Sequence, residues 1–223
     1  EMLRSLVGSE MCIRDSQNGD TAFWDKLQQT GYETVSTEVF AKMADTQTPQ
    51  GILTVLEQPV YDLTQLLEQP DPLFLMLENL QDPGNLGTMI RTGEGAGITG
   101  VIMNNQTVDI FNPKTIRATM GSIFRVPFVY VPDLALVLEQ MHAKGIHTYA
   151  AHLKGQEYYD SFSFREPTAF LIGNEGNGLS KEISDQAGQY LKIPMEGRVE
   201  SLNASIAAAL LMYEAHRQRS ARL

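Results

Sequence analysis

Cysteine, long apolar runs and signal-like segments are scarce or absent in this chain of 223 residues. Cys12 is the only cysteine, so one chain can form neither an internal disulfide nor a thiolate metal site. The apolar run at residues 206–213 is far shorter than the roughly 20 residues that a membrane-spanning helix needs, and we find no convincing signal peptide. We therefore expect a protein of the reducing cytoplasm without membrane association.

Positive charge is also in short supply, because the formal net charge is −10 at neutral pH. This balance argues against a protein that coats nucleic acid through a generally basic surface. A local basic segment remains at residues 111–130, which carry Lys114, Arg117 and Arg125 without any Asp or Glu. From charge alone, the segment is either a local site for a polyanion or a solvated face that carboxylates elsewhere balance.

Two nucleotide-binding motifs are missing or out of context. The P-loop pattern G-x-x-x-x-G-K-[ST] does not occur. Residues 95–100 match G-x-G-x-x-G, but they end a predicted helix and precede a predicted strand, the reverse of the dinucleotide-binding order. We interpret Gly95 and Gly97 as a helix C-cap and tight connection. We predict no metal site, because no metal-ligand spacing with carboxylates occurs among the histidines, which are His142, His147, His152 and His216.

Apolar segments beyond residue 72 alternate between strand and helix patterns. Strands are predicted at residues 73–77, 101–103, 126–131, 147–153, 168–172 and 190–193, and helices at 86–96, 112–119, 134–142, 179–187 and 203–217. This alternation predicts an α/β fold with a mainly parallel, doubly wound sheet, whose ligands bind beyond the carboxyl ends of the strands.

The segment before this region is too short to close a core of its own. Thr37 is predicted to cap a helix over residues 38–43, and a turn at residues 48–51 leads to a strand at 52–56. We interpret residues 59–72, with Pro70 and Pro72, as a linker.

Residues 173–180 follow an apolar strand and hold three glycines, two amides and one carboxylate within their first six positions. Glycines let backbone groups approach a ligand closely, so this segment is predicted to be a binding loop; an ordinary turn before a helix is the alternative. Polar loops at residues 78–87 and 193–203 also follow predicted strands. All three can converge on one edge of a doubly wound sheet.

Three side chains in these loops could carry chemistry or only support the structure. Arg91 lies six residues after Asn85, about one and a half turns into a helix predicted to begin near Leu86. It could reach back to the loops, or be a surface ion-pair partner. Ser201 and Asn203 precede the last helix, where they could cap it or contact an anionic ligand.

Taken together, residues 81–92, 173–180 and 193–203 resemble the three motifs of the SpoU/TrmH RNA 2′-O-ribose methyltransferases, in the same order. Residues 117–127 also resemble the segment that links the first two motifs. The resemblance implies that residues 73–223 form a SPOUT methyltransferase domain with a C-terminal trefoil knot, and that the protein is a homodimer.

The N-terminal residues fit this family only in part. Residues 17–58 are similar to the end of its ribosomal-protein-like substrate-binding domain, so we expect a remnant of a small α/β domain there. Residues 7–16 resemble translated sequencing-adaptor reads, and we therefore expect residues 1–16 to be a non-native segment.

The resemblance also implies the cofactor and the site. S-adenosylmethionine is the expected cofactor, and its expected contacts are Leu153, Gly173, Asn174, Ile193, Met195 and Leu202. The expected catalytic residues are Asn85, Arg91, Glu175, Ser201 and Asn203. RNA is expected to bind Lys114, Arg117 and Arg125. Glu175 is assigned to orienting Arg91 or a loop across the site.

The expected reaction is attack of an RNA ribose 2′-hydroxyl on the cofactor's methyl group. Arg91 matches a family residue often regarded as a general base, yet a guanidinium stays protonated in proteins. We therefore expect it to anchor a phosphate and to stabilise the developing alkoxide.

Ribosomal RNA is the expected substrate and transfer RNA the alternative. A non-catalytic RNA-binding protein of the same fold is a further alternative. Methylation of a small molecule or a protein is disfavoured by the basic segment and by the substrate-domain remnant.

Overall fold

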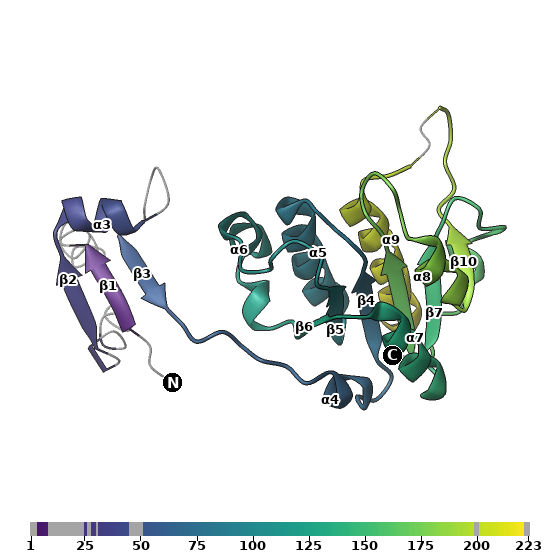
Figure 1. Cartoon of the computed structure of the whole chain (residues 1–223), viewed down its shortest axis with the longest axis horizontal. Coiled ribbons are helices and arrows are strands. Elements are labelled where there is room, and N and C mark those ends of the chain that lie inside the picture. Colours follow the sequence, from purple (N-terminus) through teal and green to yellow (C-terminus); the bar gives the residue numbers. More distant parts are fainter. Residues whose placement is uncertain are drawn as a thin grey trace. The chain divides into compact units, whose positions relative to one another are not determined.

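The computed structural model describes residues 4–8, 25, 28–29, 31–44, 51–198 and 201–220 (Figure 1). The chain divides into two compact units, Glu1–Pro59 and Val60–Leu223. Cys12 and most of the turn predicted at residues 48–51 lie outside the described residues.

The described residues of the first unit include a three-stranded sheet in the order β2-β1-β3 and the helix α3 (Thr37–Met43). Strand β1 (Arg4–Gly8) is parallel to β2 (Tyr32–Val35) and antiparallel to β3 (Ile52–Val55). The central strand β1 therefore falls within the segment that we expect to be non-native.

The cap of α3 differs from the prediction. Ser36, not Thr37, is the N-cap, because Ser36 has an extended backbone and its Oγ accepts the Val39 N–H at 3.3 Å. Thr37 is already the first helical residue. Two hydroxyl residues in a row left the cap ambiguous in the sequence, and the prediction chose the wrong one.

Helix α4 (Leu63–Leu67) lies in the segment that was predicted to be a linker. Asp62 caps this helix by accepting the Gln65 N–H at 2.9 Å. Leu66 and Leu67 are buried with residues of the second unit's sheet, so this unit begins well before the first strand of that sheet.

The second unit is built on a seven-stranded parallel sheet in the order β6-β5-β4-β9-β7-β10-β8. Strands β5 and β6 continue from β4 to one side, whereas β7, β10 and β8 lie beyond β9 on the other. The predicted mainly parallel, doubly wound sheet is confirmed; the trefoil knot stays a prediction. The strands are β4 (Leu73–Leu77), β5 (Gly100–Asn104), β6 (Phe128–Val131), β7 (His147–Ala151), β8 (Glu157–Tyr158), β9 (Thr168–Ile172) and β10 (Gln189–Lys192).

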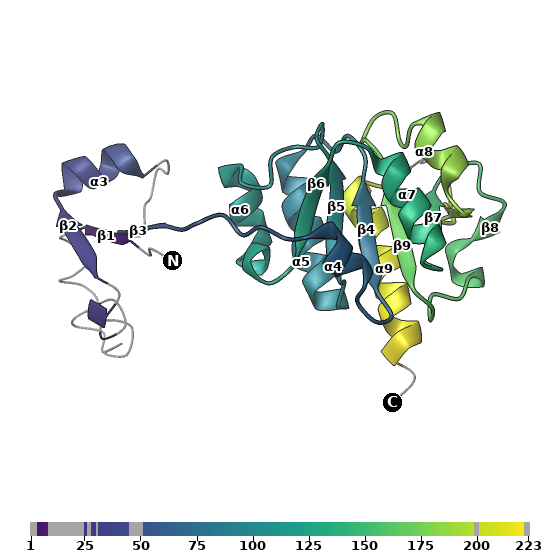
Figure 2. The same cartoon turned by 60° about the horizontal axis from the view of Figure 1, so that its bottom comes forward.

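Helices cover both faces of this sheet (Figure 2). Besides α4, the helices of this unit are α5 (Pro83–Ala96), α6 (Pro113–Thr119), α7 (Leu134–Ala143), α8 (Lys181–Gln186) and α9 (Ala204–Ser220), with short 3-10 turns η1 (Ser122–Phe124) and η2 (Tyr159–Ser161). Helices α5 and α9 pack on one face, and α4, α7 and α8 on the other.

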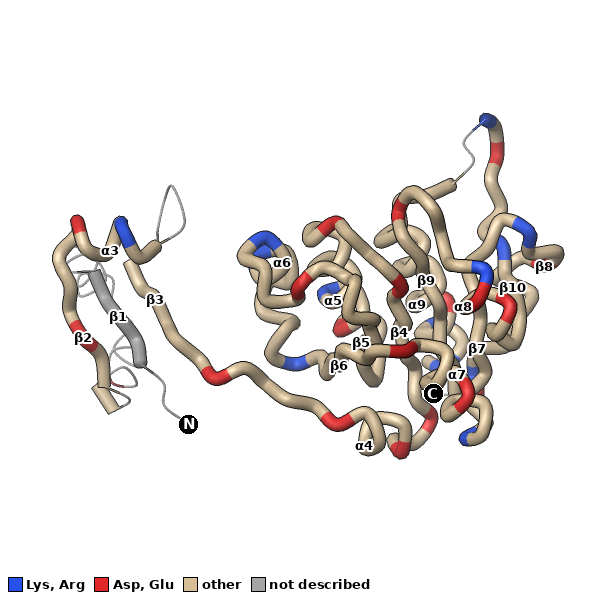
Figure 3. Tube along the Cα trace, viewed as in Figure 1, with Lys and Arg blue, Asp and Glu red and all other residues tan. Residues whose placement is uncertain are grey.

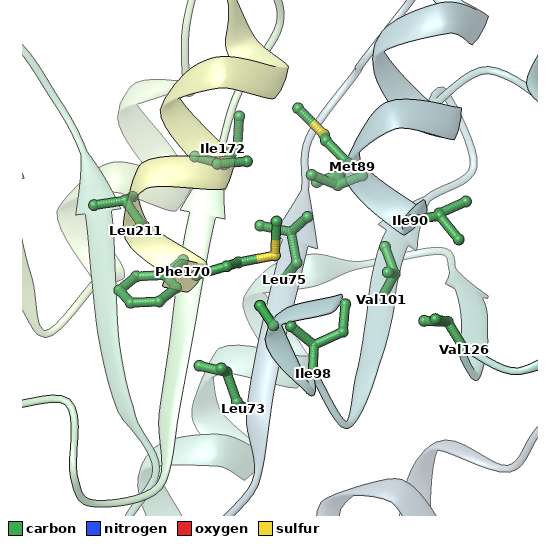
Figure 4. Packing of buried hydrophobic residues seen from close by; sticks show 14 of the residues in the cluster. Leu73, Leu75, Met89, Ile90, Ile98, Val101, Val126, Phe170, Ile172 and Leu211 are labelled. Carbon is green, nitrogen blue, oxygen red and sulfur yellow. The ribbon is translucent and has the colours of Figure 1, made fainter. Parts of the chain in front are cut away.

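Strand β4 shows how the core is divided between these two faces. Leu73 and Leu75 belong to the cluster that includes α5 and α9, whereas Phe74 and Met76 belong to the opposite cluster. Figure 4 shows the first cluster, with Leu75 between residues of the two helices. Burial on both faces explains why β4 is continuously apolar instead of alternating.

Helix α5 begins three residues earlier than predicted, at Pro83 instead of Leu86. Asp82 is its N-cap, because its Oδ1 accepts the Asn85 N–H at 2.7 Å, and Pro83 fits the first position of a helix. Arg91 therefore lies about two turns from the start of the helix instead of one and a half. At the other end, Gly97 is the C-cap with φ 75°, which confirms the interpretation of this glycine pair.

Candidate functional site

A cavity of about 350 Å³ lies beyond the carboxyl ends of β7, β9 and β10. The start of α9 closes it from a further side. All of the residues that were predicted to contact a cofactor line this one cavity, namely Leu153, Gly173, Asn174, Ile193, Met195 and Leu202. Glu175 and Ser201, from the predicted catalytic set, also line it.

The largest share of the lining comes from residues 172–179, which include most of the glycine loop, as we call residues 173–180. Asn174 and Gly178 exchange two backbone hydrogen bonds of 3.0 and 2.8 Å. The Asn174 Oδ1 atom accepts the N–H groups of Gly176 and Asn177 at 2.9 and 3.0 Å. Gly178 has φ 69°, which favours glycine. The Asn174 amide thus organises the loop itself.

Gly173 is indispensable for a reason different from the predicted one. A Cβ atom there would lie 2.0 Å from the carbonyl carbon of Gly178 and 2.1 Å from the backbone nitrogen of Leu179. The end of the loop therefore crosses directly over Gly173. The close approach that requires a glycine is made by the loop's own backbone.

Glu175 connects the glycine loop to residues 78–85, which we call the Asn85 loop. One carboxylate oxygen accepts the Asp82 N–H at 2.9 Å and the Asn85 Nδ2 at 3.0 Å, and the other accepts the Gln81 N–H at 3.1 Å. Partial burial alone would raise the pKa of Glu175, but these hydrogen bonds outweigh it and hold the pKa below its ordinary value. Of the two roles expected for Glu175, these contacts match the orientation of a loop across the site.

A second bridge joins the Asn85 loop to the start of α9. The Nδ2 of Asn203 donates to the Oδ1 of Asn85 at 3.0 Å. The Oδ1 of Asn203 accepts from the backbone N–H and the hydroxyl of Ser205 at 2.8 and 2.6 Å, and so caps α9. Hydrogen bonds therefore run from Glu175 through Asn85 to Asn203 and tie together the three polar loops that were predicted to converge.

Arg91 is the predicted site residue that the structure leaves apart. Its side chain is exposed on α5 and does not line the cavity. Among the described residues, it forms no hydrogen bond or ion pair with Glu175 or with any other side chain. The expectation that Arg91 reaches back to the polar loops assumed that the helix begins near Leu86, whereas α5 begins three residues earlier, at Pro83.

The three predicted RNA-binding cations lie on α6 and just after η1 (Figure 3). Lys114 forms an ion pair of 3.2 Å with Asp82, and Arg125 forms one with Glu94. The hydrogen bond from Arg125 lowers the pKa of Glu94 to about 2. Arg117 is exposed and has no ion pair with the described residues. Because Glu94 of α5 and Asp82 at its N-cap supply the two carboxylates, the island of positive charge is partly neutralised in the folded chain.

Glu78 is a residue of this region to which the sequence assigned no role. Its side chain is only 6% exposed, and its Oε2 accepts the Ser180 N–H at 2.7 Å. The signal in the sequence was a carboxylate directly after a continuously apolar strand, since a buried carboxylate requires a partner.

Metal sites and membrane-spanning helices are both absent from the part of the chain that the structure describes. No group of three or more His, Cys, Asp or Glu side chains there could hold a metal ion. No helix among those residues is long and apolar enough to cross a bilayer.

Comparisons with known proteins agree on one family. The model of the SpoU rRNA Methylase family matches residues 72–213. The chain is 35% identical over 179 residues to the 23S rRNA (guanosine(2553)-2′-O)-methyltransferase RlmP of Bacillus subtilis, covering 80% of this chain and 70% of that protein. It is 33% identical over 199 residues to a 23S rRNA (uridine(2479)-2′-O)-methyltransferase of Streptomyces viridochromogenes, covering 83% and 69%.

A solved structure is similar over nearly the whole chain. The SpoU methyltransferase AviRb of Streptomyces viridochromogenes, in complex with the cofactor AdoMet, superposes with a TM-score of 0.82 at 29% identity, covering 97% of this chain and 83% of that one. The residues that the family model matches, 72–213, include the seven-stranded sheet and the three polar loops at residues 78–87, 173–180 and 193–203. This chain therefore belongs to the SpoU rRNA methylase family.

Proposed function

We propose that this protein transfers the methyl group of S-adenosylmethionine to a ribose 2′-hydroxyl of ribosomal RNA and that it acts as a homodimer. The observation that supports this most strongly is the cavity, because residues from three separate loops, all expected to contact the cofactor, line one space. The relatives RlmP and the uridine(2479) enzyme are named as 23S rRNA 2′-O-methyltransferases, and AviRb was solved with AdoMet.

The cavity suits a ligand of this size and chemistry. Its volume of about 350 Å³ lies at the lower end of the range for small-molecule sites, roughly 300–1,000 Å³. Leu153, Ile193 and Leu202 provide apolar contacts, and the backbone of the glycine loop provides hydrogen-bonding groups. A purine can bind to such groups without a charged side chain.

The protein's contribution to the reaction is mainly positional. S-adenosylmethionine, when bound, supplies an electrophilic methyl group on a positively charged sulfur. The ribose oxygen would take this methyl group, with the electron pair of the carbon–sulfur bond going to sulfur and the hydroxyl proton to solvent. The hydrogen bonds among Asn85, Glu175 and Asn203 hold the Asn85 loop, the glycine loop and the start of α9 in a fixed arrangement.

Arg91 is proposed to enter this site from the second protomer. Its charge would anchor a phosphate next to the target ribose and stabilise the developing alkoxide. An exposed apolar face on α9 supports dimer formation, because Ile206, Leu210 and Tyr213 are 49%, 37% and 49% exposed and line a common groove. Arg91 and this face then have partners that a single chain does not provide.

The RNA class and the cellular location are part of the same proposal. Ribosomal RNA is preferred over transfer RNA because the most informative relative names specify 23S rRNA. Such a substrate places the enzyme in the cytoplasm, and the proposed displacement requires no metal ion.

The test is transfer of tritium from labelled S-adenosylmethionine to purified ribosomal RNA and transfer RNA, followed by mapping of 2′-O-methyl sites. We expect label in ribosomal RNA, with one ribose as the dominant acceptor. Label confined to transfer RNA would show that the substrate is transfer RNA and not ribosomal RNA. No transfer to either RNA by a dimer that binds the cofactor would overturn the proposed reaction.

A further inference from the structure

Glu78 is a buried carboxylate one residue beyond the end of β4. Its backbone N–H continues the pairing of β4 with β9 by donating to the Ile172 carbonyl at 3.0 Å. Its side chain leaves the strand and accepts the backbone N–H of Ser180 at 2.7 Å. Ser180 is the last residue of the glycine loop and the N-cap of α8. Glu78 therefore fixes the point at which the glycine loop ends.

The contact is half of a reciprocal arrangement. Glu175 of the glycine loop accepts backbone N–H groups of the Asn85 loop, and Glu78 of the Asn85 loop accepts a backbone N–H of the glycine loop. Between them, the Asn174 Nδ2 donates to the Asn79 carbonyl at 2.9 Å. Each loop thus presents a carboxylate to the backbone of the other, and the two loops are held at both ends.

We propose that Glu78 is a positioning residue that holds the glycine loop closed and thereby sets the affinity for the cofactor without touching it. The inference rests on the proposed function, because it concerns the cofactor of that same cavity. Glu78 does not line the cavity, whereas Leu179, next to its hydrogen-bond partner, does and is 9% exposed.

The geometry of the loop explains why this anchor matters. The end of the loop crosses over Gly173, so release of Ser180 would let the backbone of Gly178 and Leu179 lift away from the cavity. A loop that must be ordered during binding weakens affinity, and a loop that is already ordered does not. Burying the Glu78 carboxylate costs free energy, and its hydrogen bond to the Ser180 N–H offsets part of this cost while it preorganises the glycine loop.

Two variants of Glu78 test the proposal. Glu78→Ala removes the acceptor, and Glu78→Gln keeps one oxygen for the Ser180 N–H. By calorimetry with S-adenosylmethionine, we expect Glu78→Ala to raise the Kd by about tenfold, which corresponds to loss of one hydrogen bond to a charged group. Glu78→Gln should restore most of that affinity. In steady-state assays, KM for the cofactor should rise while KM for RNA stays unchanged.

A matched control separates this effect from general loss of stability. Thr148 is 1% exposed, and its Oγ1 accepts the Gly188 N–H at 2.8 Å. Thr148→Val therefore removes another buried acceptor of a backbone N–H, at the amino-terminal end of β7, whereas the cavity lies beyond the carboxyl end of that strand. We expect it to lower the melting temperature and to leave the cofactor Kd at the wild-type value.

The donor side offers a second test that does not require Glu78→Ala to fold. Ser180 has φ −61°, which proline adopts, and proline has no N–H. Ser180→Ala removes only the side-chain cap, so the ratio of the Kd values of Ser180→Pro and Ser180→Ala isolates the N–H. We expect this ratio to be about tenfold in the otherwise wild-type protein and nearly as large in the Glu78→Gln background, where the amide oxygen still accepts the Ser180 N–H.

The possible results lead to distinct conclusions. A folded Glu78→Ala variant with the wild-type Kd, or a Ser180→Pro to Ser180→Ala ratio near one with Glu78 present, would overturn the proposal. An equal rise in Kd for Thr148→Val would also overturn it, because the effect would then be general. Failure of the wild-type protein to bind S-adenosylmethionine would instead refute the proposed function.

Discussion

The two sides of the candidate site differ in how far a single chain completes them. On the cofactor side, hydrogen bonds among Glu175, Asn85 and Asn203 tie the Asn85 loop to the glycine loop and to the start of α9, both of which line the cavity. On the substrate side, Arg91 and Arg117 are exposed without ion pairs among the described residues. Buried backbone N–H and C=O groups must find hydrogen-bond partners when the chain folds, whereas an exposed cation is solvated by water until a ligand binds. The contrast suggests that the cofactor site is preformed and that RNA and a second copy complete the rest.

The largest expected effect is the loss of transfer in Arg91→Ala with unchanged cofactor affinity. Removal of a group that stabilises developing negative charge costs about 10²- to 10³-fold in kcat. Single-turnover transfer and calorimetry measure the two properties separately. Arg91→Lys keeps the charge but loses the planar fork, so it should recover only part of the rate. A loss of cofactor affinity in Arg91→Ala as large as the loss of transfer would show that Arg91 supports cofactor binding, and the two sides would then not differ in this respect.

The next prediction concerns Gly173 on the cofactor side. Gly173→Ala should weaken cofactor binding by at least about 100-fold, because its Cβ would collide with the backbone that crosses over it. Gly97→Ala is the matched control, since it strains a positive φ at the end of α5. It should lower the free energy of unfolding by about 1 kcal/mol and leave the Kd unchanged. Normal cofactor affinity in Gly173→Ala would contradict the observed path of the loop.

These two variants together test whether the dimer joins the two sides. If Arg91 acts across the interface, a mixture of Arg91→Ala and Gly173→Ala chains forms some dimers with one competent site. Random pairing in a symmetric dimer gives about a quarter of the wild-type number of such sites. Recovery of activity after mixing and refolding supports action between protomers. A mixture as inactive as its components would place Arg91 within the site of its own chain.

Glu175 should show an intermediate effect that depends on pH. Its pKa is depressed in the folded chain, so its charged contacts are fully present above the ordinary carboxyl pKa and are lost as the pH falls through the lower folded value. The ratio of the cofactor Kd of Glu175→Gln to that of the wild type should therefore be largest near neutrality. It should shrink toward one in acid. A ratio that does not change with pH would show that the charge of Glu175 contributes nothing.

Much of the fold followed from the sequence, and the reasons for the exceptions are physical. Strands β4 and β9 have the predicted bounds because continuous apolar runs mark buried parallel strands. The start of α5 was missed because Asp82 and Pro83 can form either a loop or a cap and first position, and only the folded backbone selects between them. The cavity residues came from the resemblance to a family. The alternation of strands and helices alone predicted that the three polar loops can converge, but not which atoms in them form hydrogen bonds.

Contacts between distant elements were the part that no local pattern could reveal. Arg125 and Glu94 are 31 positions apart and belong to different elements, so residues 111–130 read as uniformly positive. Glu78 and Ser180 are 102 positions apart. Their pairing depends on β4 and β9 being neighbours in the sheet, which the order of strands along the chain does not specify.

The smallest predicted effect distinguishes two arginines on the substrate side. Each phosphate contact contributes to the salt dependence of RNA binding, so removal of one lowers the slope of log K against log salt by about 0.7 to 0.9. Arg117→Ala should show this change because Arg117 has no ion pair with the described residues. Arg125→Ala should show less, since Glu94 already holds that guanidinium.

Glu94→Gln provides the reverse test of the same pair. Without the carboxylate, Arg125 becomes available to RNA, so binding should tighten and the slope should increase. The pKa of Glu94 is about 2, so the wild-type pair stays intact throughout the pH range in which RNA binding is measured. Equal slopes for Arg117→Ala and Arg125→Ala would show that RNA displaces Glu94 at no cost. Exposed ion pairs on the substrate side would then be no obstacle to binding, and only the cofactor side would be fixed before the substrate arrives.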